Sequence, residues 1–361
     1  MTTGLRFAFF GSSLISAYWN GACTYYRGLI QALNARGHQV TFYEPRAYER
    51  QEHRDIDDPP YARVVVYEPE SAGAVRAVVS GAERVDVIVK TSGVGIFDDV
   101  LETAVLQRSD AALRVFWDVD APATLGNMET DPGNALRALV PDYDLVLTYG
   151  GGDPVVERYR ALGARRCVPI YNGLDPETHH PAPADPRFAA DLTLLANRLP
   201  DREQRIEEFF FGPARGRPRL SFLLGGNGWG DGRLPNVRCL GHVPPGDHNA
   251  VNCSARAVLN VSRDGMAANG FSPATRVFEA AGAGACLITD AWNGVAEFFA
   301  PDEEILVARD GEEVGTLLDG LAPEHAAGIG AAARERALTE HTYAQRAALV
   351  EDVVTQMLAG V

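Results

Sequence analysis

One stretch in the second half of the chain carries residues whose types and spacing suit the binding of an anion. Ser272 followed by Pro273 predicts a helix start, with Ser272 as N-cap and Pro273 at the first helical position. The free N–H groups of the first turn form an anion site, and Arg276 adds a fixed cation. Thr275 and Arg276 lie four and three residues before Glu279, so all three share a helix face. This arrangement outlines a nucleotide-diphosphate site with a carboxylate for the ribose, but it equally suits a capped helix with an internal Arg276–Glu279 ion pair.

A second pair of cations follows the predicted strand 192–196. Arg198 lies in the loop after this strand and Arg202 at the start of the next helix. Asp201 is the expected N-cap of that helix, with Gln204 three residues later as in a capping box. Both guanidinium groups can then clamp one phosphate at the carboxyl edge of a sheet, which we favour over two solvated surface charges.

Two acidic residues follow a predicted strand in the first half. Asp118 and Asp120 resemble a D-x-D pair that holds a metal ion on a diphosphate. They also suit a general base or a hydroxyl-positioning group that faces an acceptor, or a cap for the turn at Pro122. The metal interpretation is the least favoured, because the arginines and the helix start already supply positive charge.

Other polar or glycine-rich segments carry weaker signals. His179 and His180 lie in a proline-rich segment and are interpreted as solvated rather than catalytic. The glycine-rich run 225–230 follows a strand without opening a convincing helix, so it lacks the context of a dinucleotide-binding fingerprint.

The elements that position these residues are short apolar strands alternating with helices. Most of the strands are near-continuous runs of Val, Ile, Leu and Phe, which is typical of parallel strands buried on both faces. Strands are predicted over 6–10, 40–44, 63–66, 85–90, 113–117, 144–149, 167–170, 192–196, 220–224, 237–240, 257–261, 285–289 and 305–307. Helices are predicted over 22–36, 154–162, 202–211, 273–281, 295–299, 312–321 and 343–358. The alternation predicts an α/β fold with two doubly wound parallel-sheet, Rossmann-like domains that face each other across a cleft.

A proline-rich segment separates the two series of elements. Four prolines stand within 175–186, which is typical of a linker. The sequence therefore predicts an N-terminal domain over 1–175, a linker over 176–190 and a C-terminal domain over 191–342. The last segment, 343–361, is expected to form a helix that crosses back to the N-terminal domain.

Composition excludes several classes of function. A net charge of −15 over 361 residues argues against nucleic-acid binding, which needs a basic face. The five cysteines include no C-x-x-C pair, so neither a zinc site nor a disulfide framework is predicted. The first apolar stretch, Leu5–Phe10, is too short for a signal peptide, and no run approaches the ~20 residues of a membrane span. A cytoplasmic protein with no stable membrane association is expected.

The second half resembles the donor domain of GT-B glycosyltransferases of the family-4 type, most closely their CgeB-like, spore-protein branch. The most specific part of this resemblance lies between Thr275 and Glu279. The other matching segments are 197–198 with Arg202, 241–243, 260–263, the start of the stretch at Ser272, 289–294 and 303–306, and upstream 20–38 and 116–125. The resemblance covers most of the chain and implies a GT-B fold.

By position, the resemblance implies a role for each matching residue. Glu279 is expected to bind the donor ribose, and Arg198 and Arg202 the diphosphate. The backbone at His242 and Val243 would contact the nucleobase. The remaining residues assigned to the donor are Gly11, Asn20 and Gly21, which would close over it from the first domain, and Arg263, Ser272, Thr275 and Arg276.

The chain departs from the family pattern at one position. Family-4 enzymes carry two glutamates eight positions apart, but Phe271 stands eight residues before Glu279, and Asn269 replaces the first glutamate if the Gly-Phe pairs align. The transferred sugar and the stereochemistry are thus left open, with retention favoured by the resemblance.

The resemblance implies transfer of a sugar from a nucleotide-diphosphate donor, uridine type favoured, to a soluble small-molecule or glycan acceptor, without a metal or another cofactor. Arg198, Arg202, Asp118 and Asp120 are the expected catalytic residues. The alternatives are a sugar-nucleotide epimerase of the same fold and a non-catalytic carbohydrate-binding or coat protein. No oligomeric state is predicted.

Overall fold

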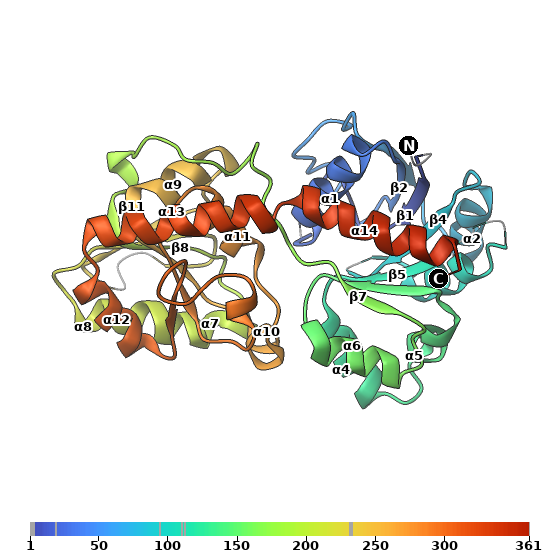
Figure 1. Cartoon of the computed structure of the whole chain (residues 1–361). Helices are drawn as coiled ribbons and strands as arrows, with labels where there is room; N and C mark the ends of the chain where they lie inside the picture. The colour runs from blue at the N-terminus through green and yellow to red at the C-terminus, as the bar shows by residue number, and fades with distance from the viewer. Residues whose placement is uncertain are drawn as a thin grey trace. The chain divides into compact units, whose positions relative to one another are not determined.

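The computed structural model describes residues 4–18, 20–93, 95–109, 111, 113–230 and 234–360 (Figure 1). The chain forms two compact units, the first made of residues 1–171 and 343–361 and the second of residues 172–342. The division thus falls after Tyr171 rather than after Asp175, and the segment expected as a linker belongs to the second unit. Within the described ranges, no helix is both long and apolar enough to cross a membrane.

The first unit is built on a seven-stranded parallel sheet with the order β3-β2-β1-β4-β5-β6-β7. Its strands are β1 (Arg6–Phe10), β2 (Gln39–Pro45), β3 (Arg63–Tyr67), β4 (Val87–Thr91), β5 (Leu113–Asp118), β6 (Leu145–Thr148) and β7 (Cys167–Pro169). Successive side chains point to opposite faces, so Phe9 and Phe10 enter different cores. Every strand predicted in this half is confirmed.

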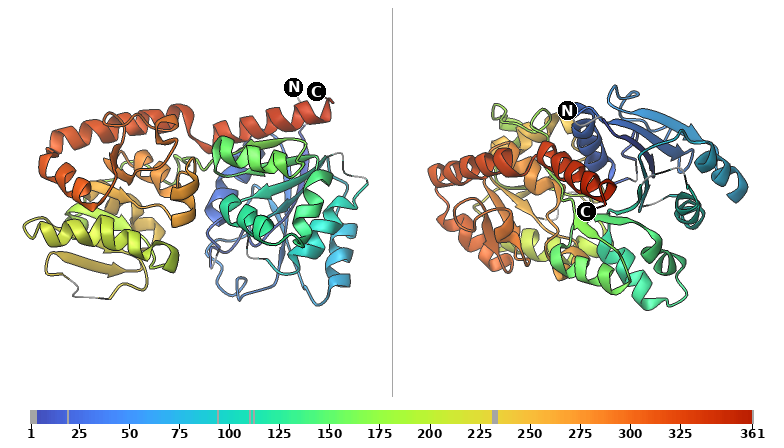
Figure 2. Two further views of the ribbon diagram at one scale, coloured as in Figure 1. Left: turned by 90° about the horizontal axis from the view of Figure 1, so that it is seen from below. Right: turned by 45° about the vertical axis from the view of Figure 1, so that its right-hand side comes forward.

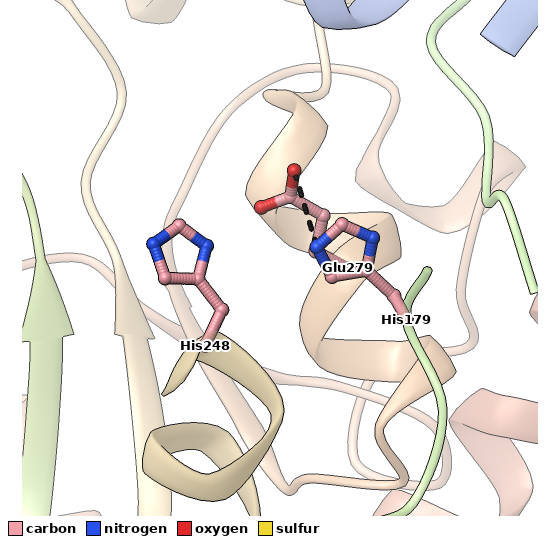
Figure 3. Close-up of side chains that lie close together, drawn as sticks. All are labelled: His179, His248 and Glu279. Carbon is pink, nitrogen blue, oxygen red and sulfur yellow. Dashed lines mark ion pairs between the residues drawn. The ribbon is translucent and has the colours of Figure 1, made fainter. Parts of the chain in front are cut away.

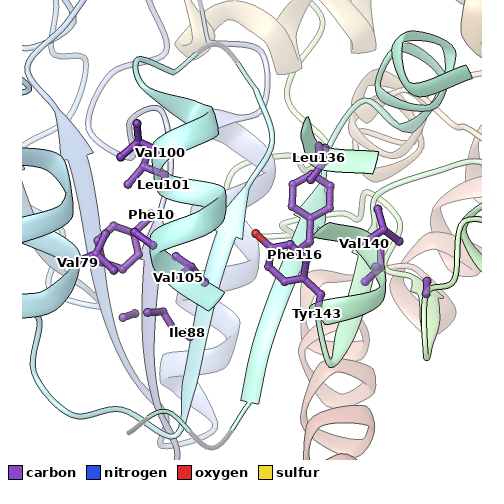
Figure 4. Packing of buried hydrophobic residues seen from close by; sticks show 14 of the residues in the cluster. Phe10, Val79, Ile88, Val100, Leu101, Val105, Phe116, Leu136, Val140 and Tyr143 are labelled. Carbon is purple, nitrogen blue, oxygen red and sulfur yellow. The ribbon is translucent and has the colours of Figure 1, made fainter. Parts of the chain in front are cut away.

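Helices cover both faces of this sheet. One face carries α2 (Ala72–Gly81), α3 (Asp98–Leu106), α4 (Ala121–Thr130), α5 (Ala135–Leu139) and α6 (Gly152–Ala161). Figure 4 shows part of that core, where strand residues such as Phe10, Ile88 and Phe116 lie among helix residues such as Val79 and Val105. The other face carries α1 (Cys23–Ala35) and α14 (Tyr343–Leu358).

The final helix, α14, packs along α1 within the first unit (Figures 1 and 2). The approach is close at Gly28, where an added Cβ would lie 2.3 Å from ring atoms of Tyr343. Tyr343, Val350 and Val354 are buried in this contact. The end of the chain therefore supplies part of the core around its beginning.

The second unit is built on a six-stranded parallel sheet with the order β10-β9-β8-β11-β12-β13. Its strands are β8 (Ala190–Leu195), β9 (Phe222–Gly225), β10 (Val237–Gly241), β11 (Ala255–Asn260), β12 (Leu287–Asp290) and β13 (Leu306–Ala308). Its helices are α7 (Pro200–Ile206), which continues through the π-helical turn η3 (Glu207–Phe211) into α8 (Gly212–Gly216), and α9 (His248–Ser254), α10 (Asp264–Asn269), α11 (Thr275–Gly282), α12 (Gly311–Gly320) and α13 (Pro323–Glu340). The strands of this half are also as predicted, whereas the helix expected over 295–299 is only the short 3₁₀ turn η5 (Val295–Glu297). The predicted α/β fold with two doubly wound, Rossmann-like parallel sheets is confirmed.

Helix α13 packs against α11. It also contacts the turn that follows α11, where the two backbones lie so close that the position on α13 requires a glycine. A Cβ on Gly330 would lie 2.1 Å from the carbonyl oxygen of Gly284, whereas one on Gly328 would meet nothing within 4 Å. We expect Gly330→Ala to destabilise the protein by about 1–3 kcal/mol, because the backbones must move apart. The matched control Gly328→Ala, on the same helix, should be neutral or stabilising by up to about 1 kcal/mol. Urea denaturation measures both, and equal effects would contradict the close contact.

Candidate active site

The candidate site of the second unit lies where the order of strands reverses. Strands β8 and β11 are neighbours, but the chain continues from β8 to β9 on one side and from β11 to β12 on the other. Ligands of doubly wound sheets bind beyond the carboxyl ends of the strands at such a switch point. Arg202 follows β8, and Arg263 and Arg276 follow β11, so the topology directs three cations to this edge.

Arg202 and Arg276 are only partly exposed, and their Nε atoms are buried. Within the described part of the chain, neither Nε has a hydrogen-bond partner. The pKa of Arg202 is lowered to about 10, first by burial and then by the positive charges of Arg276 and Arg263, while Asp201 acts in the opposite direction. Burial also lowers the pKa of Arg276, with Glu279 acting in the opposite direction. Both groups stay cationic at neutral pH.

The nearby carboxylates already have partners. Asp201 accepts a hydrogen bond from Arg263 Nε. Asp290, at the end of β12, is fully buried and accepts from Arg205 Nη2 at 2.6 Å and from the backbone N–H of Ser262 at 3.0 Å. Positive charge is therefore in excess around Arg202 and Arg276, which makes this edge suitable for an anion.

Arg198 does not join this cluster, contrary to the prediction that it clamps one phosphate together with Arg202. Its side chain is exposed and forms an ion pair with Glu203. The loop backbone explains this orientation, because the N–H of Arg198 donates to the carbonyl of Asn227 at 2.9 Å. The N–H of Asn227 in turn donates to Asn197 Oδ1, so two loops hold each other in place.

The helix start at Ser272 and Pro273 was predicted wrongly. Helix α11 begins at Thr275, with Ala274 as its N-cap and no side-chain cap. The Ser272 hydroxyl donates instead to the carbonyl of Gly270 at 2.9 Å, since Gly270 and Phe271 both have positive φ and turn the chain back on itself.

Thr275 and Asp201 also take other roles than those predicted. The Thr275 hydroxyl donates to Asn172 Oδ1 at 3.2 Å, and Asn172 Nδ2 donates to the carbonyl of Pro273. This amide therefore fixes the start of α11. At α7, the N-cap is Leu199 rather than Asp201, because Pro200 occupies the first helical position.

Glu279 points toward two histidines that the sequence analysis did not assign to the site (Figure 3). His179 Nε2 lies 3.7 Å from Glu279 Oε1, and the ligand atoms of His179, His248 and Glu279 all lie within 4.8 Å of one another. His179 is only 14% exposed, so its interpretation as a solvated linker residue was wrong. Burial lowers the pKa of His248, which Glu279 opposes and Arg276 reinforces.

The two residues expected at the nucleobase differ in exposure. His242 is exposed, whereas Val243 is buried against Leu223 and Val251. The carbonyl of Val243 lies 3.3 Å from His248 Nε2. Its backbone thus belongs to the surroundings of Glu279.

In the first unit, Asp118 is fully buried and its carboxylate is saturated with hydrogen bonds. Oδ1 accepts from Ser92 Oγ at 2.8 Å, from Thr124 Oγ1 at 2.9 Å and from the backbone N–H of Asp120 at 3.0 Å. Tyr159 donates to Oδ2. Burial raises the pKa of Asp118, and these donors oppose the shift. The saturated carboxylate does not suit an acceptor-facing base, and it fixes the turn that opens α4 at Asp120, which agrees with the alternative of a cap for the turn at Pro122.

Gly11, Asn20 and Gly21 lie at and after the switch point of the first sheet, between β1 and β4. A Cβ on Gly11 would lie 2.6 Å from Thr91 Oγ1, so close strand packing requires this glycine. Asn20 is buried, and its amide accepts from Ser12 Oγ and donates to the carbonyls of Ser13 and Ser16. That amide holds the loop after β1. Gly21 is exposed with open space at its Cα.

A cavity of about 320 Å³ lies entirely within the first unit, beyond the ends of β4 and β5. Its lining combines polar groups such as Ser92, Thr124 and Asn127 with apolar Phe116. Glu102 also lines it, and burial raises the pKa of that carboxyl to about 7. The cavity therefore offers hydroxyl and amide groups to a small polar molecule.

Comparison with known proteins agrees with this architecture. The family described as Glycosyl transferase-like matches residues 202–352. No curated protein matches the sequence. Sucrose-phosphate synthase from Thermosynechococcus elongatus is similar in structure, with a TM-score of 0.72 at 16% identity over 99% of this chain and 100% of that chain.

Two further structures are similar over nearly their whole length. Anabaena Alr3699/HepE, in complex with UDP and glucose, has a TM-score of 0.69 at 15% identity over 98% of this chain and 100% of that chain. The catalytic domain of starch synthase IV from Arabidopsis thaliana, bound to ADP and acarbose, has a TM-score of 0.69 at 11% identity over 99% of this chain and 100% of that chain. The chain thus has the fold of GT-B glycosyltransferases, and most of its second unit resembles a glycosyl transferase-like family.

Proposed function

We propose that this protein is a glycosyltransferase of the CgeB-like branch that moves a sugar, a hexose or a related one, from a nucleoside-diphosphate donor to a soluble small-molecule or glycan acceptor. A uridine-type donor is favoured, because the similar Alr3699/HepE was solved with UDP and glucose. We place the reaction in the cytoplasm, since the cysteines of the described chain are all free thiols.

The observation that carries this proposal is the surplus of buried positive charge at the switch point of the second sheet. Arg202 and Arg276 each keep a buried Nε without a protein acceptor in the described ranges, and Glu279 lies one turn from Arg276. A diphosphate would supply the missing anion, and its ribose would reach the carboxylate. Leaving-group charge develops on that diphosphate, so preorganised guanidinium groups lower the barrier to transfer.

The same charges make a catalytic metal ion unnecessary, and we propose a metal-independent reaction. We also propose retention of configuration, in which the departing phosphate accepts the proton of the acceptor hydroxyl. The saturated carboxylate of Asp118 agrees with a mechanism that needs no side-chain base there. The cavity beside Ser92 and Asn127 is the proposed acceptor site.

Incubation with a panel of nucleotide sugars and candidate acceptors tests the proposal. A transferase releases nucleoside diphosphate only as sugar appears on the acceptor. An altered sugar that is still attached to the nucleotide would instead identify an epimerase. Failure of every nucleoside diphosphate to bind would leave a carbohydrate-binding protein.

Glu279→Gln tests the ribose contact separately. The substitution removes the charge but keeps one acceptor, so nucleotide affinity should fall by about 1–1.5 kcal/mol, or about tenfold. Isothermal titration calorimetry with UDP measures this, with exposed Glu324→Gln as the control. Unchanged affinity in a folded Glu279→Gln variant would contradict the assignment.

A further inference from the structure

Glu279 and the two histidines beside it come from three separate elements of the second unit. His179 lies in the segment before β8, His248 begins α9 and Glu279 lies on α11. All three side chains keep part of their surface exposed, so a solute can reach them. Figure 3 shows both imidazole rings directed at the Glu279 carboxylate.

Hydrogen bonds determine which nitrogen of His179 carries the proton. The Thr178 hydroxyl donates to the carbonyl of Asp175 at 3.2 Å, so it has only lone pairs left for its neighbour. His179 Nδ1 lies 3.0 Å from this hydroxyl oxygen and donates to it when the hydroxyl donates to Asp175. In the neutral ring, the Nε2 atom that faces Glu279 then carries a lone pair.

The same reasoning applies to His248. Its Nε2 lies 3.3 Å from the carbonyl oxygen of Val243, which can only accept a hydrogen bond. In the neutral ring, Nδ1 thus carries the lone pair, and it is the nitrogen left to face Glu279. With both rings neutral, the three atoms that face one another are therefore two nitrogen lone pairs and a carboxylate oxygen. None of the three is a hydrogen-bond donor.

We propose that His179 Nε2, His248 Nδ1 and Glu279 form a binding site for a zinc-type divalent ion, and that this ion excludes the nucleotide from Glu279. The second part rests on the proposed function, in which the same carboxylate binds the ribose. The ion is therefore an inhibitor of donor binding and not a participant in transfer.

The geometry and the donor set agree with this site. Tetrahedral zinc with bonds of about 2.0–2.1 Å holds its ligand atoms about 3.3–3.4 Å apart. The three protein atoms already lie within 4.8 Å of one another, so small side-chain rotations bring them to the ion. Each imidazole is anchored through its other nitrogen, as zinc-bound histidines are.

The charge of Arg276 opposes a cation here, because this guanidinium acts on both His248 and Glu279. It is attractive to a diphosphate for the same reason. The two ligands thus share Glu279 and respond to Arg276 in opposite directions, and binding of one should exclude the other.

Calorimetry of the full chain with zinc chloride and with UDP, separately and together, tests the proposal. Zinc should bind at one site per chain. At ten times its dissociation constant it should raise the apparent Kd of UDP about elevenfold by simple competition. Cobalt(II) as a spectroscopic probe should give a tetrahedral absorption spectrum without thiolate charge-transfer bands, which separates this site from the free cysteines.

Variants assign the site to these residues. His179→Ala and His248→Ala should each weaken zinc binding by at least about tenfold and remove its effect on UDP. The adjacent, exposed His180→Ala is the matched control and should change neither. Zinc binding that survives both variants, or zinc and UDP that bind independently, would overturn the proposal. Zinc binding without binding of any nucleotide would instead overturn the proposed function and leave the metal site standing.

Discussion

Arg202→Met should lower the rate of sugar transfer by about 10²–10³-fold, the loss expected when one preorganised group that stabilises developing charge is removed. Arg202 is placed for this role because its buried Nε has no protein acceptor in the described structure and because two further guanidinium groups lie near it. UDP affinity should fall as well, by about 1.5–3 kcal/mol or about 10- to 150-fold. Steady-state kinetics and calorimetry separate the two effects.

Arg198→Met is the matched control for this experiment. The side chain of Arg198 is exposed and paired with Glu203, so its loss should reduce the transfer rate far less than the loss of Arg202. A larger effect at Arg198 than at Arg202 would contradict the structural assignment. Such a result would support the prediction from the sequence that Arg198 binds the phosphate together with Arg202.

The two variants should also differ in stability. Burial and like charges disfavour the charged form of Arg202 in the folded protein, so its pKa falls to about 10. At pH values below about 10 this residue therefore costs folding free energy, and Arg202→Met should raise the thermal denaturation midpoint in the absence of nucleotide. A variant that is more stable but less active is the expected signature of a binding site.

The sequence predicted the sheets well because buried parallel strands leave a strong local signal. Runs such as Val87–Thr91 and Leu145–Thr148 are almost wholly apolar or β-branched, and no helix periodicity competes with them. Helix α13 was not predicted, since alanine and glycine occupy most of its buried positions and few large side chains mark its apolar face. Its packing depends instead on the close backbone contact at Gly330, which no local pattern reveals.

The residue at which a helix starts was also hard to predict. Ser272 and Pro273 have the residue types of a helix start, but the turn at Gly270 and Phe271 uses the serine hydroxyl and delays the helix to Thr275. The face shared by Arg276 and Glu279 was nevertheless placed correctly on α11, because helical spacing is local.

Long-range contacts account for the rest of the candidate site. The sequence identified Arg202 and Glu279, but it could not bring His179 and His248 to Glu279 across intervals of 100 and 31 residues. Nor could it separate Arg198 from Arg202, since the backbone of Arg198 is held by Asn227 in the loop after the neighbouring strand β9. No helix was predicted at His248, where α9 begins, and His179 was interpreted as a solvated residue.

Asp118→Ala should destabilise the protein by about 3 kcal/mol or more, the largest effect on folding that we expect. The substitution leaves the hydroxyl groups of Ser92, Thr124 and Tyr159 without their acceptor, and the side chain of Tyr159 is fully buried. It also frees the N–H of Asp120 at the start of α4. Chemical denaturation followed by circular dichroism measures the loss.

Asp118→Asn separates this structural role from catalysis. Asparagine keeps one oxygen for the three donors on Oδ1, and its amide can donate to the Tyr159 hydroxyl, so the variant should fold with a smaller loss of stability. Because the carboxylate is enclosed by its own donors, transfer by the folded variant should stay within about tenfold of the parent. If Asp118 were a general base, Asp118→Asn would lower turnover by about 10²–10⁴-fold. Such a fall in a stable Asp118→Asn protein would show that Asp118 acts on the acceptor. It would contradict the base-free mechanism and support one in which Asp118 abstracts the proton of the acceptor hydroxyl.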